Sequence, residues 1–170
     1  MTDRKLRRSI RSGKAFALVL IIAAAATGAL SVRQALLPPP GERPELGVRI
    51  QTAAAALGDG EALDINNFTN FTWQRLIVLP AYAPDSVARQ ALGFEWPAER
   101  LPSSDNDAWT TLIFADDGRV VAWCQLESSR VNFHSELYAG PLVVAASQAR
   151  FLGHYGADGV VELKLSEGSP

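Results

Sequence analysis

The sequence predicts an α+β protein with an N-terminal transmembrane helix followed by a small domain, in which an antiparallel sheet of about four to six strands carries helices on one face. Three observations support this class: a long uncharged segment near the N-terminus, a β-rich stretch divided by a tight turn, and helical periodicity confined to the early part of the domain. The 170 residues, of which 48% are apolar and 20% charged, suit one folded domain with an appendage.

The N-terminus has the charge pattern of a membrane anchor. Residues 1–14 carry six basic side chains against Asp3 alone, and residues 15–32 contain no charged side chain. A helix over this uncharged run is about 27 Å long, close to the thickness of the hydrocarbon layer. The positive-inside rule then places residues 1–14 in the cytoplasm and the rest of the chain outside it.

A cleaved secretory signal peptide is the alternative interpretation of the same segment. Ala29-Leu30-Ser31 has the small-x-small pattern of a cleavage site near Ser31, and many of the apolar residues are alanine. No cysteine follows the apolar run, which excludes a lipoprotein anchor. Both alternatives export the domain, either as a single-pass protein of the inner membrane or as a secreted or periplasmic protein.

The remaining composition excludes several classes of function. From residue 33 onward the chain has ten basic and seventeen acidic residues, and a domain of this charge repels nucleic acid. One cysteine is too few for an intramolecular disulfide or for a cysteine-rich metal site. No phosphate-binding glycine motif is present, so we expect neither a cofactor nor a metal.

A proline-rich linker and a helix are expected at the start of the exported part. Residues 33–44 include Pro38, Pro39 and Pro40, which favour a stiff extended conformation and separate the anchor from a domain over residues 45–170. Apolar residues then recur at helical spacing, and Gly58 is suited to end the helix. Because the helix stripe is rich in small residues, we expect the helix to lie close against a sheet.

The stretch 109–126 predicts a β-hairpin. Asp117-Gly118 favours a two-residue type I′ turn, whose register places Phe114 opposite Val121 and Leu112 opposite Trp123. Both faces of these strands are substantially apolar, which indicates central strands covered on both sides. Cys124 is therefore expected to be a small buried core residue.

Further elements follow along the chain. Asp158-Gly159 predicts a second hairpin, in which His154 faces Leu163 on the apolar side. The other expected elements are a strand over 71–79, a short helix from Pro84 to Leu92 that Gly93 closes, and an apolar run over 142–146 that begins a strand or a helix.

The two histidines are the candidate catalytic residues. His134-Ser135-Glu136 contains a base, a hydroxyl and an acid, but neighbouring side chains of an extended chain point to opposite faces and cannot form a relay. His154 is one half of a catalytic pair or, alternatively, a hydrogen-bonded core residue. The run 105–107 resembles the start of a calcium loop, but the glycine and glutamate that such a loop requires later are missing.

An aromatic cluster over 68–96 offers candidate binding residues. Trp73, Tyr82 and Trp96 belong to it. The tryptophans are expected to pack a helix onto the sheet, and the alternative is a groove for a partner or ligand, because Trp and Tyr are frequent anchors of binding sites.

The same region resembles a family. Residues 71–82, FTWQRLIVLPAY, followed by LGFEW at 92–96, are similar to an aromatic-x-W-D-x-V-x-V-x-x-P-Y…L-G-x-x-W pattern of small uncharacterised bacterial lipoproteins and secreted envelope proteins. Gln74 stands at the position of the aspartate, and the lipidated cysteine of the group is absent. The resemblance implies an envelope location, and it does not indicate a biochemical activity.

Together these observations predict a membrane-anchored bacterial cell-envelope protein. Residues 15–32 contact the membrane, the exported domain acts by binding, and another envelope protein is a candidate partner. Two alternatives stay open at this point: a small exported hydrolase that uses His134 or His154, and an accessory subunit of a membrane complex.

Overall fold

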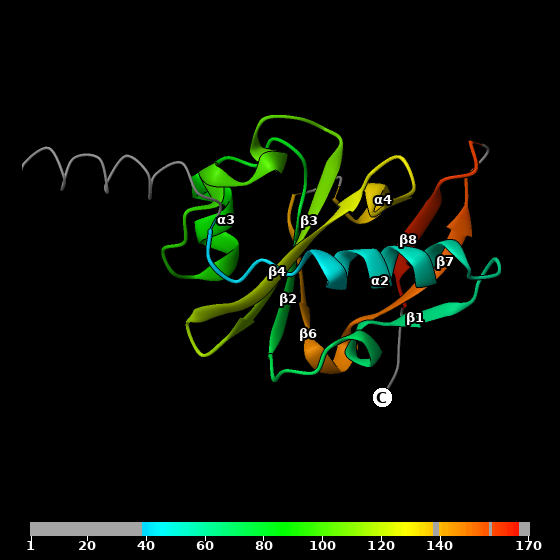
Figure 1. Ribbon diagram of the computed structural model, residues 1–170, viewed down its shortest axis with the longest axis horizontal. Helices are drawn as coiled ribbons and strands as arrows, with labels where there is room; N and C mark the ends of the chain where they lie inside the picture. The colour runs from blue at the N-terminus through cyan, green and yellow to red at the C-terminus, as the bar shows by residue number, and fades with distance from the viewer. Residues whose placement is uncertain (1–38, 138–139, 157, 167–170) are drawn as a thin grey trace, which may run out of the picture. The chain divides into compact units, whose positions relative to one another are not determined.

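Figure 1 shows the computed structural model of the chain, which describes residues 39–137, 140–156 and 158–166. The expected transmembrane helix over 15–32 lies outside the described residues. Within the described ranges, no helix is both long enough and apolar enough to cross a membrane. The side chains of His134 and Ser135 are also outside the description.

Four antiparallel strands form the first sheet, sheet A, in the order β4-β3-β2-β6. Their bounds are β2 Arg75–Leu79, β3 Trp109–Asp116, β4 Arg119–Glu127 and β6 Leu142–Ala145. β3 and β2 are the central strands and are buried almost throughout. Their burial follows from apolar side chains on both faces, a pattern that requires a cover on each side.

Four further strands form sheet B in the order β1-β7-β8-β5, in which only β5 and β8 pair in parallel. Their bounds are β1 Ala62–Asp64, β5 Val131–Asn132, β7 Arg150–Tyr155 and β8 Val161–Leu165. The α+β class is therefore confirmed, but the sequence predicted one sheet where the structure has two. Six of the eight strands were recognisable from local patterns, whereas the short strands β1 and β5 were not predicted, and the division between sheets depends on pairings between distant segments.

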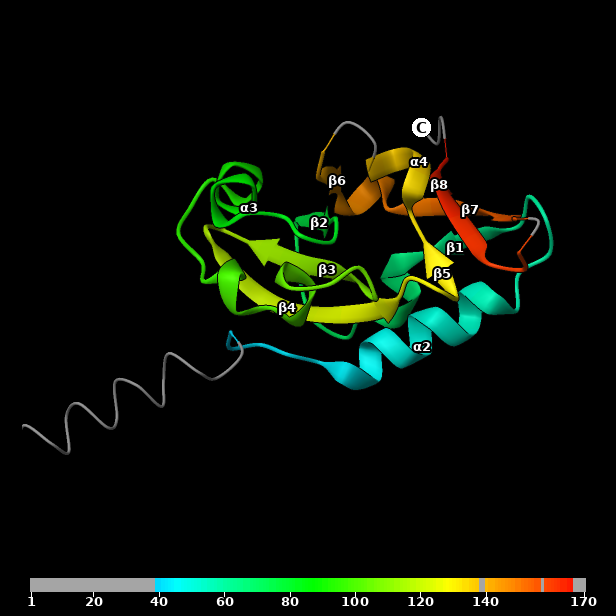
Figure 2. The same ribbon diagram turned by 90° about the horizontal axis from the view of Figure 1, so that it is seen from above.

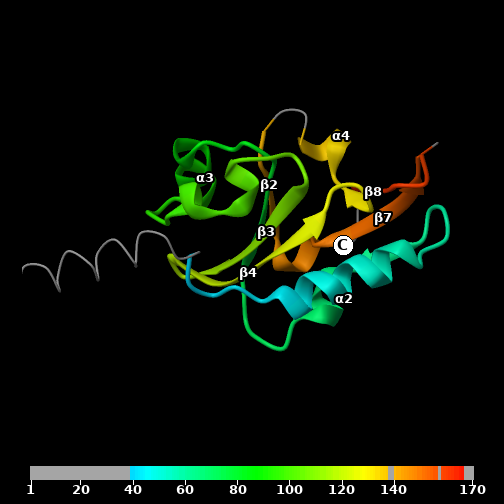
Figure 3. The same ribbon diagram turned by 45° about the horizontal axis from the view of Figure 1, so that its top comes forward.

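Helices cover the sheets on two sides, as Figure 3 shows for α2 and α3, so the prediction of helices on one face was wrong. The main core lies between α2 and the two sheets, and a second core lies between sheet A and α3. The helices are α2 Pro44–Ala55, α3 Asp85–Leu92 and α4 His134–Leu137, with 3₁₀ turns η1 Ile65–Phe68, η2 Ala98–Arg100, η3 Pro102–Ser104 and η4 Ala146–Gln148. Successive residues of β3 alternate between the cores: Leu112 and Phe114 face the main one, Ile113 and Ala115 the second.

The β3–β4 hairpin has the expected turn and an unexpected register. Asp117 and Gly118 both have positive φ, at 43° and 76°, as a type I′ turn requires. The register shifts between Phe114 and Ala115, so that Phe114 pairs with Ala122 rather than with Val121. The predicted pairing was wrong beyond the turn because a β-bulge adds one residue to β4.

The bulge determines which β4 side chains meet α2. It turns Trp123 into the second core and leaves Ala122 and Cys124 facing the main core beneath the helix. Small side chains are needed there because the helix approaches closely: a Cβ added at Gly47 would lie 3.4 Å from the Cβ of Cys124. Cys124 is fully buried, as expected, and burial raises the pKa of its thiol to about 12.

The β7–β8 hairpin also differs from the prediction by one residue. His154 pairs with Glu162, and Gly153 takes the position opposite Leu163. Because the turn between the strands is longer than the expected two residues, His154 moves from the apolar face to the other face of β7. The expectation of a core histidine was therefore wrong.

The segment before α2 lies along the outer edge of β4, as Figure 2 shows. The indole Nε1 of Trp123 donates to the carbonyl of Pro39 at 3.1 Å, its backbone N–H donates to Gly41 O at 2.9 Å, and its carbonyl accepts from Arg43 N at 2.8 Å. Residues 39–43 fall within the expected linker, and in the structure they cover an edge that would otherwise present unpaired backbone groups.

The remaining elements agree with their sequence signals in most respects. α3 begins after Pro84 and ends at Gly93, whose left-handed φ of 79° closes the helix. The run after Pro141 begins with the strand β6, followed by the turn η4. β2 begins at Arg75, later than the expected start at residue 71, because Phe71 and Trp73 pack around Phe114 instead of pairing in the sheet.

Candidate functional site

The three aromatic residues proposed for binding do not form one exposed patch. Trp73 is 6% exposed in the main core, whereas Trp96 is 8% exposed in the second core on the opposite face of sheet A. Tyr82 is 58% exposed and has a positive φ of 57°. The structure therefore gives the two tryptophans packing positions and leaves Tyr82 alone at the surface.

Specific contacts fix both tryptophans. The Trp73 ring meets Phe114 edge-on at 5.2 Å between centroids, and its Nε1 donates to Thr69 Oγ1 at 3.0 Å. The Trp96 ring packs edge-on against Trp123 at 6.3 Å. Edge-to-face pairs of this kind add to the stability that burial alone supplies.

The histidines are placed differently from each other. His154 Nδ1 lies 3.3 Å from Asp59 Oδ1, and both side chains are substantially exposed. A His–Asp pair orients an imidazole, but no hydroxyl or thiol of the described residues is hydrogen-bonded to His154, so this pair lacks a nucleophile. His134 begins α4, and its side chain lies outside the description.

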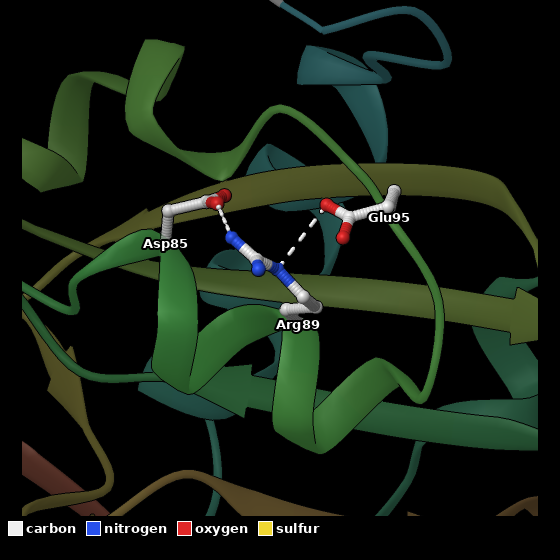
Figure 4. Close-up of polar contacts among 3 residues, drawn as sticks. All are labelled: Asp85, Arg89 and Glu95. Atoms are coloured by element: carbon white, nitrogen blue, oxygen red, sulfur yellow. Dashed lines mark hydrogen bonds and ion pairs between the residues drawn. The ribbon is translucent and has the colours of Figure 1, made fainter.

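A charged cluster joins α3 to the segment that follows it, as Figure 4 shows. Arg89 Nη2 lies 2.7 Å from Asp85 Oδ2, and Arg89 Nε lies 3.1 Å from Glu95 Oε2. The hydrogen bond from Arg89 holds the pKa of Asp85 below its usual value, and Asp85 in turn raises the pKa of the Arg89 guanidinium.

A pocket of about 280 Å³ borders this cluster, lined by Asp85, Glu95, Trp96, Pro97 and Glu99. Among the described residues, Asp85 Oδ1 and Trp96 Nε1 are buried without a hydrogen-bond partner. Because both atoms are closed off from solvent, they do not present themselves to a molecule in the pocket. The cluster serves to tie the end of α3 to the chain that returns to the sheet.

A larger pocket lies where the chain passes from sheet A to sheet B. Its volume is about 450 Å³, within the range of sites that hold small molecules. Figure 2 shows this passage from β4 into β5 and then α4. The described residues that line the pocket come from three stretches that are distant in sequence, 80–81, 107–110 and 128–137: Pro80, Ala81, Asp107, Thr110, Ser128, Asn132, Phe133 and Leu137.

One wall of this pocket is apolar and held rigidly. Phe133 is fully buried, and its ring meets Phe151 of β7 edge-on at 5.2 Å between centroids. Leu137 of α4 packs against the same core, and Pro80 closes the wall directly after β2. Such a wall accepts the apolar part of a ligand.

Hydroxyl, amide and carboxylate groups also line the pocket. Thr110 Oγ1 and Ser128 Oγ lie 3.3 Å apart across the ends of β3 and β4. Asp107 is exposed at the pocket, in a loop that hydrogen bonds hold in place. Asn106 Nδ2 donates to Pro102 O at 2.9 Å, its Oδ1 accepts from Ala108 N at 3.0 Å, and Ala108 O accepts from Ser128 N at 2.9 Å.

No sequence motif predicted this pocket. In the sequence, Asp107 is notable only as part of the calcium-like run 105–107. Within the described ranges, no group of three or more histidine, cysteine, aspartate or glutamate side chains is arranged to hold a metal ion. Thr110 and Ser128 belong to strand ends that carry no special pattern. These two hydroxyls meet through the register of β3 and β4, which the β-bulge shifts by one residue from the register that the turn predicts.

Comparisons with known proteins add no identification. No family model matches the chain, and neither the curated proteins nor the solved structures contain a match. The resemblance to small envelope lipoproteins stays a prediction from the sequence.

Proposed function

We propose that the chain is a membrane-anchored cell-envelope protein whose domain lies outside the cytoplasm and binds a small ligand in the 450 Å³ pocket between the sheets. The anchor is proposed from the basic residues 1–14 and the uncharged run 15–32. The observation that carries the binding proposal is the pocket itself, whose lining combines apolar side chains with hydrogen-bonding groups.

The two walls have the composition of a ligand site rather than of a packing defect. Small-molecule sites combine apolar area with a few placed polar groups that orient the ligand. Pro80 and Leu137 supply apolar area, while Thr110, Ser128 and Asp107 supply polar atoms from two separate segments. The hydrogen-bonded loop before β3 keeps Asp107 in position without a bound molecule.

Binding is tested by what the protein retains on purification. The full-length chain is expressed in a bacterial host and extracted in mild non-ionic detergent, and its bound small molecules are identified by mass spectrometry. Ala81→Trp fills the pocket from its wall, and Val48→Trp adds the same ring at an exposed position of α2 as the control. We expect a molecule enriched with the wild type and with Val48→Trp and lost with Ala81→Trp.

Identical small-molecule contents in all three proteins would contradict the binding proposal. Location is tested separately by fusing alkaline phosphatase after residue 38, which leaves out the domain. Phosphatase activity is expected because the enzyme folds only outside the cytoplasm, and an inactive fusion would contradict export.

A further inference from the structure

The electrostatics of the 450 Å³ pocket favour a positively charged ligand. Asp107 is the single ionisable side chain among the described residues that line it. Its carboxylate forms no ion pair or hydrogen bond with another described residue. The stretch from residue 33 onward is itself acidic, with ten basic and seventeen acidic residues. An anionic ligand would therefore meet an unbalanced negative field, and a cationic ligand would neutralise it.

The hydroxyl pair near Asp107 suits the same charge type. One of the two hydroxyls, Thr110 Oγ1 or Ser128 Oγ, donates to the other across 3.3 Å, and lone pairs remain on both oxygens. A primary ammonium has three N–H donors and no acceptor, so it can donate to a carboxylate and to hydroxyl oxygens together. Thr110 and Ser128 both line the pocket, and Thr110 is only 5% exposed, so its side chain is held by the surrounding residues.

The apolar wall determines the chemistry of the uncharged part of the ligand. Leu137 packs against the main core and Pro80 follows directly after β2, and both are half-buried, so these two side chains present apolar surface to the part of the molecule that carries no charge. A fully polar cation would gain nothing from this wall, whereas an apolar ring or chain would be removed from water against it.

We propose that the pocket binds a small organic molecule carrying one primary ammonium group on an apolar body, with the ammonium between Asp107 and the Thr110–Ser128 hydroxyls and the body against Pro80 and Leu137. The proposal rests on the binding function proposed above and adds the class of ligand to it. Asp107 determines the charge preference, and the apolar wall determines the preference for a ring or chain.

Three probes of nearly equal shape distinguish the effect of ligand charge on binding from the effect of ligand size. They are phenethylammonium, phenylacetamide and phenylacetate, which carry a positive, a neutral and a negative group on the same ring. Each is titrated into the full-length ¹⁵N-labelled protein in non-ionic detergent, and the backbone amide shifts of Thr110, Ser128 and Phe133 report binding in the pocket. We expect phenethylammonium to bind roughly three- to tenfold more tightly than phenylacetamide, and phenylacetate most weakly.

Two variants assign the preference to one carboxylate. Asp107→Asn is expected to abolish the difference between phenethylammonium and phenylacetamide. Asp105→Asn removes the same charge from the same loop at a residue that does not line the pocket, and it is expected to retain the preference. Equal loss of the preference in both variants would overturn the proposal, because general charge and not Asp107 would then be responsible.

The remaining outcomes separate the ligand class from the binding function. If phenylacetamide or phenylacetate shifts the pocket amides at least as strongly as the cation, the ligand class is wrong and the binding function stands. If no probe shifts them, the ligand class is overturned as well. The co-purification with Ala81→Trp then decides the binding function independently.

Discussion

Gly47 is the position at which the packing of α2 on β4 is tested most sharply. Replacing a helical glycine by alanine usually stabilises a protein by about 1 kcal/mol, because alanine has the higher helix propensity. At Gly47 the added Cβ would lie closer than 3.0 Å to the carbonyl oxygen of Gln125, a separation that real Cβ atoms essentially never show. We therefore predict that Gly47→Ala destabilises the fold.

The size of the effect follows from what must move. The obstructing atom belongs to the backbone of β4, which β3 holds along its whole length. α2 cannot shift freely either, because Gln51 Oε1 accepts from Glu127 N at 2.8 Å and ties the helix to the same strand. Overpacking of this kind costs up to about 3 kcal/mol, and subtracting the propensity gain leaves a net loss of about 2 kcal/mol.

Urea unfolding of the full-length protein in non-ionic detergent measures this loss through tryptophan fluorescence. Val48→Ala serves as the control, since it changes the neighbouring, 64% exposed residue and is expected to alter the unfolding free energy by no more than about 0.5 kcal/mol. A Gly47→Ala protein as stable as the wild type, or more stable, would refute the close approach of α2 to β4.

Three further predictions follow from the contacts of the domain. Trp123→Phe removes the donor to the buried Pro39 carbonyl, and we expect the unfolding free energy, measured by urea titration, to fall by about 1–3 kcal/mol. We also expect faster proteolysis within residues 39–43, measured by timed digestion. Unchanged values in both assays would contradict the contact between this segment and the edge of β4. The depressed pKa of Asp85 stabilises the fold above the unfolded value of about 3.9, and this stabilisation is lost as the pH falls through the lower folded value. The urea midpoint of the wild type should therefore fall more steeply below about pH 4 than that of Arg89→Met, and parallel curves would contradict the ion pair. Cys124, with a thiol pKa of about 12, should not react with a thiol reagent near neutral pH until urea unfolds the protein, and rapid labelling of the native state would show that it is not buried.

Local signals in the sequence were reliable wherever the backbone conformation depends on one or two residues. Asp117-Gly118 specified its turn because these residues tolerate positive φ, and Gly93 ended α3 for the same reason. The burial of Cys124 followed from the apolar character of both strand faces.

The misassigned features depend on tertiary packing instead. The β-bulge in β4 shifts the register by one residue and so places Trp123 in the second core and Ala122 and Cys124 in the main core, and neither core is visible in a local pattern. His154 changed face through a slip of one residue in the β7–β8 register. These shifts explain why strands were found where expected while several of their facing residues were not.

The candidate site was the least predictable part. Its residues come from segments that meet only after the chain has crossed from one sheet to the other, so no spacing in the sequence links Asp107 to Ser128 or Phe133. The aromatic residues that attracted attention, Trp73 and Trp96, carry packing contacts in two separate cores. Aromatic composition alone does not distinguish a core from a binding surface.

The central claim is that the pocket between the two sheets holds a small ligand. The most direct measurement is an experimental structure of the full-length protein purified in mild detergent from its expression host without added ligand. We predict an organic molecule against Pro80 and Leu137 that hydrogen-bonds to at least one of Asp107, Thr110 and Ser128. A pocket that holds only water, or side chains closed over it, would contradict the claim.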